Sequence, residues 1–86
     1  MKTVFLLMAQ YSGKAIVPID IVCDDYFAPL TVTTFLRKIA AGDIKLPLVR
    51  MELSQKGAKG VHVEDLANYI DARRTAAVKE CRQLCD

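Results

Sequence analysis

The chain has 86 residues, of which 52% are apolar and 26% are charged, and its net charge is +2. A chain of this length and composition forms one folded domain, residues 1–86, whose core is too small to surround a large substrate pocket. The sequence has one histidine and lacks a glycine-rich phosphate loop, a nucleophile motif and paired catalytic carboxylates. We therefore expect a binding protein without a cofactor, and not an enzyme.

An apolar run near the N-terminus, residues 4–9, raises the question of a signal peptide. The run is shorter than the hydrophobic region of a signal peptide and far too short to span a membrane, and Gln10, Ser12 and Lys14 follow at once. Periodicity does not separate a short helix from a buried strand over residues 3–11. We expect a buried N-terminal element of a cytoplasmic protein that has no membrane partner.

A first amphipathic helix is predicted over residues 18–26, after a turn signal and a short β-favouring segment at residues 15–17. Pro18 suits the first position of a helix. Asp20 lies in the first turn, where a negative charge interacts favourably with the helix dipole. Apolar residues recur at helical spacing through the rest of the segment, which supports this assignment.

A second helix is predicted over residues 32–41, with Thr31 as its N-cap and Gly42 directly after its end. A turn at residues 27–30 separates the two helices, so residues 18–41 predict a helix-turn-helix. One side of the second helix is apolar and carries Val32, Phe35, Leu36, Ile39 and Ala40. The other side contains no acid and carries Thr33, Thr34, Arg37, Lys38 and Ala41.

A hairpin is predicted after the second helix. Alternating side chains indicate a strand from Leu48, with Pro47 at its start, and a return strand at residues 61–63. Residues 54–60 between these strands contain two glycines and two lysines, a composition typical of a hairpin tip. We expect a two-stranded wing at about residues 46–63.

A long amphipathic helix is predicted over about residues 64–84. Its apolar side carries Leu66, Ile70, Ala77, Cys81 and Leu84, with Tyr69 beside them. Because this helix is long for so small a domain, we expect its charged far end to project or to pack on a second copy. The elements together predict an α+β fold: a winged helix-turn-helix of the MerR or excisionase type, with a long C-terminal helix.

The charge is concentrated in the middle of the chain. Residues 31–60 hold six cations and two acids, a net charge of +4, whereas residues 1–30 and 61–86 each sum to −1. This basic stretch is either a solvated surface or a binding site for a polyanion, most often nucleic acid. In a helix-turn-helix the second helix enters the major groove, where Arg37 is suited to bidentate pairing with guanine. The predicted contacts with double-stranded DNA are Thr33, Thr34, Arg37 and Lys38 on the helix and Lys56 and Lys59 on the wing.

The three cysteines form an odd set, which argues against a secreted disulfide framework. Cys81 and Cys85 share a helix face, and with Cys23 and His62 they could supply four zinc ligands. Their spacing matches no usual zinc pattern, so we expect reduced, partly buried thiols and no metal. His62 is either the exposed member of an alternating strand or a phosphate contact beside the wing, and we favour the structural role.

Eight blocks of the sequence resemble the pyocin activator (PrtN-like) family, in the same order and over almost the whole chain. The blocks are residues 5–11, 19–27, 35–38, 46–50, 54–56, 60–62, 65–67 and 69–74. The resemblance implies a small bacterial DNA-binding protein from prophage or bacteriocin gene clusters. Among the matching positions, those that we expect to face DNA are Arg37, Lys38, Arg50, Gln55 and Lys56.

Three functions are compatible with the sequence. The first is a sequence-specific double-stranded DNA-binding regulator of prophage or pyocin genes, a transcriptional activator that also touches RNA polymerase. The second is an excisionase that binds and bends attachment-site DNA and acts with a phage integrase. The third is a protein-binding adaptor or antirepressor that docks through its C-terminal helix. For the two DNA-binding functions we expect that helix to support a homo-oligomer or a cooperative assembly on DNA.

Overall fold

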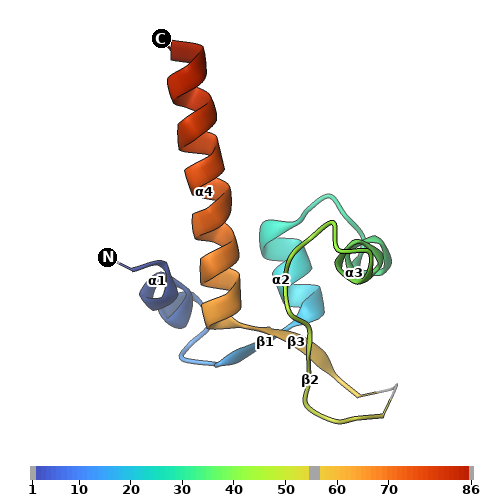
Figure 1. Cartoon of the computed structure of the whole chain (residues 1–86). Coiled ribbons are helices and arrows are strands. Elements are labelled where there is room, and N and C mark those ends of the chain that lie inside the picture. The colour runs from blue at the N-terminus through green and yellow to red at the C-terminus, as the bar shows by residue number, and fades with distance from the viewer. Residues whose placement is uncertain (1, 55–56, 86) are drawn as a thin grey trace.

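The computed structural model describes residues 2–54 and 57–85. These residues form an α+β structure of four helices and a three-stranded antiparallel sheet (Figure 1). In chain order the elements are α1 (Thr3–Gln10), β1 (Ile16–Pro18), α2 (Ile19–Tyr26), α3 (Val32–Ala40), β2 (Val49–Arg50), β3 (Lys59–His62) and α4 (Val63–Cys85). No helix among the described residues is long and apolar enough to cross a membrane.

The sheet has the strand order β1-β3-β2, so the strand that follows the β2–β3 connection lies in the middle. Val17 of β1 opposes Val61 of β3, and Gly60 opposes both Pro18 and Val49. A Cβ on Gly60 would lie 2.6 Å from Ile16 Cγ2 and 2.7 Å from the carbonyl oxygen of Val17. The close approach of β1 to β3 therefore requires glycine at this position.

One small core joins almost every element. Its fully buried side chains come from α1, β1, α2, α3, β3 and α4, and they are Leu7, Val17, Val22, Cys23, Phe35, Val61 and Leu66. Phe27, in the turn after α2, stacks on Phe35 with ring centroids 4.4 Å apart and lies 5.5 Å from the ring of Tyr69 on α4. This aromatic group fixes α3 against α2 and the base of α4.

Local sequence signals set the limits of α3 as predicted. The side chain of Thr31 accepts a hydrogen bond from the Thr34 N–H at 3.2 Å, which caps the first turn. Gly42 has a φ of +82°, the left-handed conformation that ends a helix. Phe35 is buried as expected, whereas Ala40, predicted on the apolar side, is exposed because it lies at the edge of that side.

The N-terminal segment is a helix, which resolves the choice left open by its sequence. The expectation of a buried element is wrong for most of this helix, because only one side of it packs on the core: Leu7 is its one buried side chain, and Phe5 and Leu6 are more than half exposed. Thr3 Oγ1 donates to Asp71 of α4 at 2.6 Å. At the other end of α1, the Tyr11 hydroxyl donates to Asp25 at 2.7 Å and the Tyr26 hydroxyl donates to Gln10 at 2.5 Å. These bonds tie α1 to α2 and α4.

The predicted hairpin differs from the structure in three ways. The first strand is limited to Val49–Arg50, and the return strand ends at His62 because Val63 already begins α4. β1 pairs with β3, so the expected two-stranded wing is part of a three-stranded sheet. Most of the predicted tip is described, but Gln55 and Lys56 lie outside the described residues.

The long C-terminal helix is confirmed, with a sharp change in burial along its length. Val63, Leu66 and Ala67 are buried, and Tyr69 and Ile70 are half-buried. Every residue from 71 to 85 is exposed, and α4 extends beyond the rest of the chain over most of this stretch (Figure 1). The side chains of Ala77, Cys81 and Leu84 continue the apolar stripe but are exposed.

Candidate nucleic-acid interface

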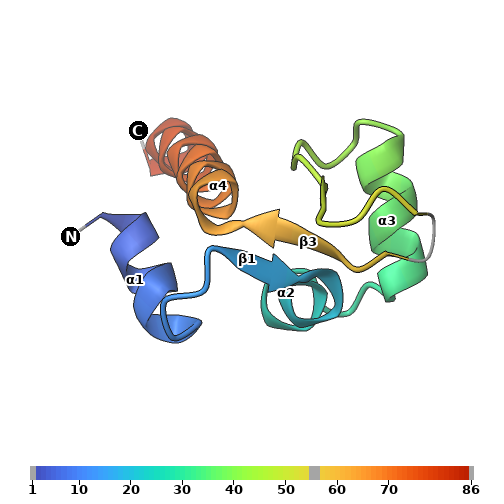
Figure 2. The same cartoon turned by 90° about the horizontal axis from the view of Figure 1, so that it is seen from below.

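α3 and β2 lie on the same side of the molecule, away from the exposed end of α4, whereas β3 runs from β2 to the base of α4 (Figures 1 and 2). A groove of about 420 Å³ separates α3 from the two strands. Its walls come from α3, from the segment that leads into β2, from β2 and from β3, and they consist of Leu36, Arg37, Ile39, Ala40, Leu48, Arg50 and Lys59. Three of these seven residues are cations and none is an acid, so the groove presents positive charge around an apolar floor.

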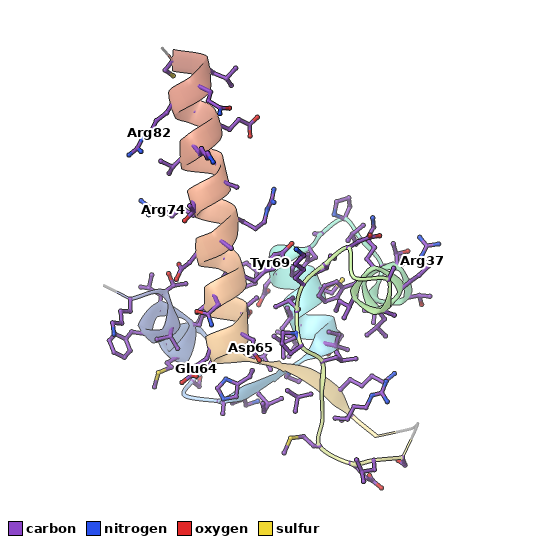
Figure 3. The ribbon with its side chains drawn as sticks, viewed as in Figure 1. Arg37, Glu64, Asp65, Tyr69, Arg74 and Arg82 are labelled. Carbon is purple, nitrogen blue, oxygen red and sulfur yellow. The ribbon has the colours of Figure 1, made fainter. Side chains whose placement is uncertain are left out.

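Arg37 reaches this groove because Phe35 fixes the rotation of α3. Phe35 is fully buried, and Arg37 lies two residues further on, about 200° around the helix. The Arg37 side chain is therefore exposed and extends away from the core, as Figure 3 shows. Leu36 and Ile39 flank it and form part of the apolar floor.

Arg50 and Lys59 reach the same groove through the register of the sheet. They are directly opposite each other in the β2–β3 ladder. Opposite residues in an antiparallel pair lie on the same face of the sheet, where two like charges destabilise the pairing. The fold thus holds two cations side by side at a cost that a polyanion ligand would relieve.

The other predicted contacts are placed differently. Thr33 is exposed on α3. Thr34 is half-buried, and its Oγ1 lies 3.0 Å from that of Thr31, so it takes part in the helix cap. Lys38 is also half-buried, and neither Thr34 nor Lys38 lines the groove. Gln55 and Lys56 lie outside the described residues.

The apolar floor of the groove is the part that sequence reasoning missed. Leu48 lies in it beside Arg50. Residues two apart on a strand lie on the same side of it, so the predicted strand already placed Leu48 beside Arg50. This spacing is the signal that could have identified Leu48 as part of the groove. No such signal identifies Leu36 and Ile39 as groove residues. They lie on the apolar side of α3, and from the sequence that whole side was assigned to the core.

His62 is half-buried, not the exposed strand residue that we favoured, and its side chain makes a local hydrogen bond. Its Nδ1 accepts a hydrogen bond from the backbone N–H of Glu64 at 3.0 Å, in the first turn of α4. A side-chain acceptor at this place satisfies an N–H that the helix itself leaves without a partner. The imidazole is thereby a cap of α4.

The four residues that were considered as zinc ligands do not form a cluster among the described residues. Cys23 is buried, its Sγ lies 3.2 Å from the Leu30 carbonyl oxygen, and burial raises the pKa of its thiol. Cys81 and Cys85, which were expected to be partly buried, are exposed, because they lie in the part of α4 whose side chains are all exposed. Within residues 2–54 and 57–85, no group of three or more His, Cys, Asp or Glu side chains is placed to hold a metal ion.

Comparison with known proteins gives one family match. The family model described as pyocin activator protein PrtN matches residues 3–77, from the start of α1 into the exposed part of α4. No curated protein and no solved structure matches the chain. The match contains the groove and all the elements that build it. The chain therefore belongs to the pyocin activator protein PrtN family.

Proposed function

We propose that the chain regulates pyocin genes by binding double-stranded DNA in a sequence-specific manner, and that it acts as a transcriptional activator. The observation that carries the proposal is the acid-free groove that Arg37, Arg50 and Lys59 line. Membership of a family of regulatory activators supports the same conclusion. In this proposal α2 and α3 act as a helix-turn-helix, and the β2–β3 connection acts as a wing.

The two sides of the groove have different tasks in this proposal. Arg37 lies on the exposed side of α3, where a planar guanidinium can pair with O6 and N7 of a guanine in the major groove. Arg50 and Lys59 contact phosphates, which position the protein and relieve the repulsion between the two cations. Sequence preference then depends mainly on α3, and affinity depends on both.

A second copy of the chain is the partner that we propose for the exposed half of α4. Ile70, Ala77, Cys81 and Leu84 have the 7-, 4- and 3-residue spacing of positions that face a partner helix in a coiled coil. Their stripe continues the one that packs in the core, so its exposed part is an extension of an existing interface. Sedimentation equilibrium tests this contact: the wild type should be a dimer, and Leu84→Lys should shift it towards monomer. A monomeric wild type would contradict it.

The test of DNA binding uses duplexes from the protein's own genomic neighbourhood and measures affinity at several salt concentrations. Arg50→Ala with Lys59→Ala should reduce the slope of log K against log salt by about 1.8, since each lost phosphate contact contributes about 0.9. The matched control is Lys79→Ala with Arg82→Ala, which removes the same charge from the exposed end of α4. Equal slopes for the groove variant and the wild type would refute the proposal.

Arg37→Ala separates base reading from phosphate binding. We expect it to cost about 1–3 kcal/mol on the preferred duplex and to relax preference at one base pair, with a smaller effect on unrelated duplexes. A promoter reporter in cells without an integrase then tests activation directly. If the chain binds DNA but does not activate the promoter, the activator role is refuted and only the DNA-binding role remains.

A further inference from the structure

The exposed stripe of α4 leads into a hollow at the base of the same helix. This hollow has a volume of about 170 Å³ and lies between the end of α2, the turn after it and α4. Its lining consists of one cation, Arg73, and five apolar or aromatic residues, which are Tyr26, Phe27, Leu66, Tyr69 and Ile70. Ile70 therefore belongs both to the hollow and to the stripe that continues through Ala77 to Leu84.

The two edges of the stripe carry different charges. Arg73 and Glu80 each follow a stripe residue by three positions, so both lie on one edge. Arg74 and Cys81 each follow a stripe residue by four positions, so both lie on the other edge. All four side chains are exposed. One edge thus combines a cation with an acid about two turns further on, whereas the other combines a cation with a thiol.

We propose that the second copy packs on this stripe in the antiparallel direction, with Leu84 of the partner subunit seated in the hollow beside Ile70. This packing rests on the contact with a second copy in the proposed function, and adds its direction and its docking site. Two-fold symmetry makes each contact occur twice. With the axis at Ala77, Ile70 and Leu84 lie seven positions away on either side, so each is level with the other across the pair. Leu84, which is 80% exposed in the single chain, is then covered.

The charges at the edges of the stripe favour the antiparallel direction. In an antiparallel pair the same edge of both helices meets, because the two-fold axis is perpendicular to the helices. Arg73 is then nearly level with Glu80 of the partner subunit, and the pair forms twice. In a parallel pair opposite edges meet at the same height, so Arg73 faces Arg74 of the partner subunit and four guanidinium groups gather at one level. Opposite charges at helix edges select the direction of pairing, and like charges oppose it.

The antiparallel direction also separates the two folded bodies. Leu66, in the core at the base of α4, lies eleven residues before Ala77. At 1.5 Å per residue, the two bases are therefore about 33 Å apart along the helices. One dimer thus carries a DNA-binding groove towards each of its ends, whereas a parallel dimer would carry both at one end.

Charge reversal distinguishes the two directions. Sedimentation equilibrium at low salt should show that Arg73→Glu weakens the dimer by about tenfold, because it sets an acid against Glu80 of the partner subunit. Adding Glu80→Arg should restore the affinity of the wild type. The matched control is Lys79→Glu, which makes the same charge change on the side of α4 away from the stripe and should have little effect. A stronger dimer in Arg73→Glu would indicate the parallel direction and overturn the proposal.

Cysteine crosslinking reads the direction a second time. In a chain with Cys81→Ser and Cys85→Ser, Leu84→Cys should not link to itself on mild oxidation, since antiparallel copies of this position are about 21 Å apart. Mixed with an Ile70→Cys chain of the same background, it should form a disulfide-linked heterodimer.

The outcomes separate the direction from the pairing and from DNA binding. Self-linking of Leu84→Cys without the heterodimer would overturn the antiparallel direction and leave a dimer, whereas a monomeric wild type would overturn the pairing as well. Neither experiment contains DNA, so an unchanged salt slope in the groove variant would refute DNA binding without affecting either result.

Discussion

Gly60 is the position at which a single methyl group should disturb the fold most directly. A Cβ there would stand 2.6 Å from Ile16 Cγ2 and 2.7 Å from the Val17 carbonyl oxygen. The first contact involves a side chain next to the backbone, and the second involves the backbone itself, so neither can move away freely. Overpacking of this kind costs about 1–3 kcal/mol. At about 4–8 °C per kcal/mol for a domain of this size, Gly60→Ala should lower Tm by at least about 4 °C.

A double-mutant cycle tests whether this reasoning is right. Thermal and urea unfolding would be measured for the wild type, Gly60→Ala, Ile16→Ala and the double variant. Because the new methyl group meets Ile16, Ile16→Ala should cost less in the Gly60→Ala background than in the wild type. The rescue should be incomplete, since the contact with the Val17 oxygen remains. An unchanged Tm for Gly60→Ala, or strict additivity in the cycle, would show that β1 and β3 do not approach each other as closely as the structure has them.

Three further predictions concern stability. Phe35→Ala should destabilise the chain by about 3–5 kcal/mol in urea unfolding, because it removes a fully buried ring that stacks on another ring. His62→Ala should cost about 1 kcal/mol through loss of the α4 cap, and His62→Asn should keep most of that stability; equal losses would argue against a capping role. Burial and the hydrogen bond to Asp25 raise the pKa of Tyr11, so the unfolded chain loses this proton first as the pH rises above about 10. Urea midpoints should therefore fall more steeply with alkaline pH in the wild type than in Tyr11→Phe, and parallel profiles would contradict this.

The local order of α2, the turn and α3 could be predicted from the sequence because its signals are short-range. Thr31 caps α3 through a bond to the Thr34 N–H, and Gly42 ends the helix with a positive φ. Both effects need only neighbouring residues, so residue identity decides them. The amphipathic spacing around Phe35 then orients the helix, which is why Arg37 was correctly placed on the exposed side.

The sheet could not be predicted in the same way, because its pairing depends on residues far apart in the chain. β1 has three residues and pairs with β3 more than forty positions later. Nothing in residues 15–17 specifies that partner. The pairing of Arg50 with Lys59 depends on the same long-range register, so sequence spacing identified each cation but not their opposition across the ladder.

Burial along α4 shows another limit of periodicity. The apolar stripe has the same spacing where Leu66 packs in the core and where Leu84 is exposed. A helical wheel reports which residues share a side and not whether anything covers that side. The change from buried to exposed side chains after Ile70 depends on where α1, the α2–α3 turn and the sheet end, which is a property of the whole fold.

The charge of α4 explains why its exposed end is a useful control in the DNA-binding test. Residues 61–86 sum to −1, but the exposed stretch of residues 72–85 contains four cations and one acid. This basic end extends away from the sheet on the side opposite the β2–β3 connection (Figure 1), in a molecule 51 Å long and 29 Å wide. A straight duplex that is seated in the groove and runs away from α4 would not reach Lys79 and Arg82, and their replacement should then leave the salt slope unchanged. If it reduces the slope by as much as the groove variant does, DNA also contacts α4, and an architectural role in DNA bending becomes the explanation to test in place of simple activation.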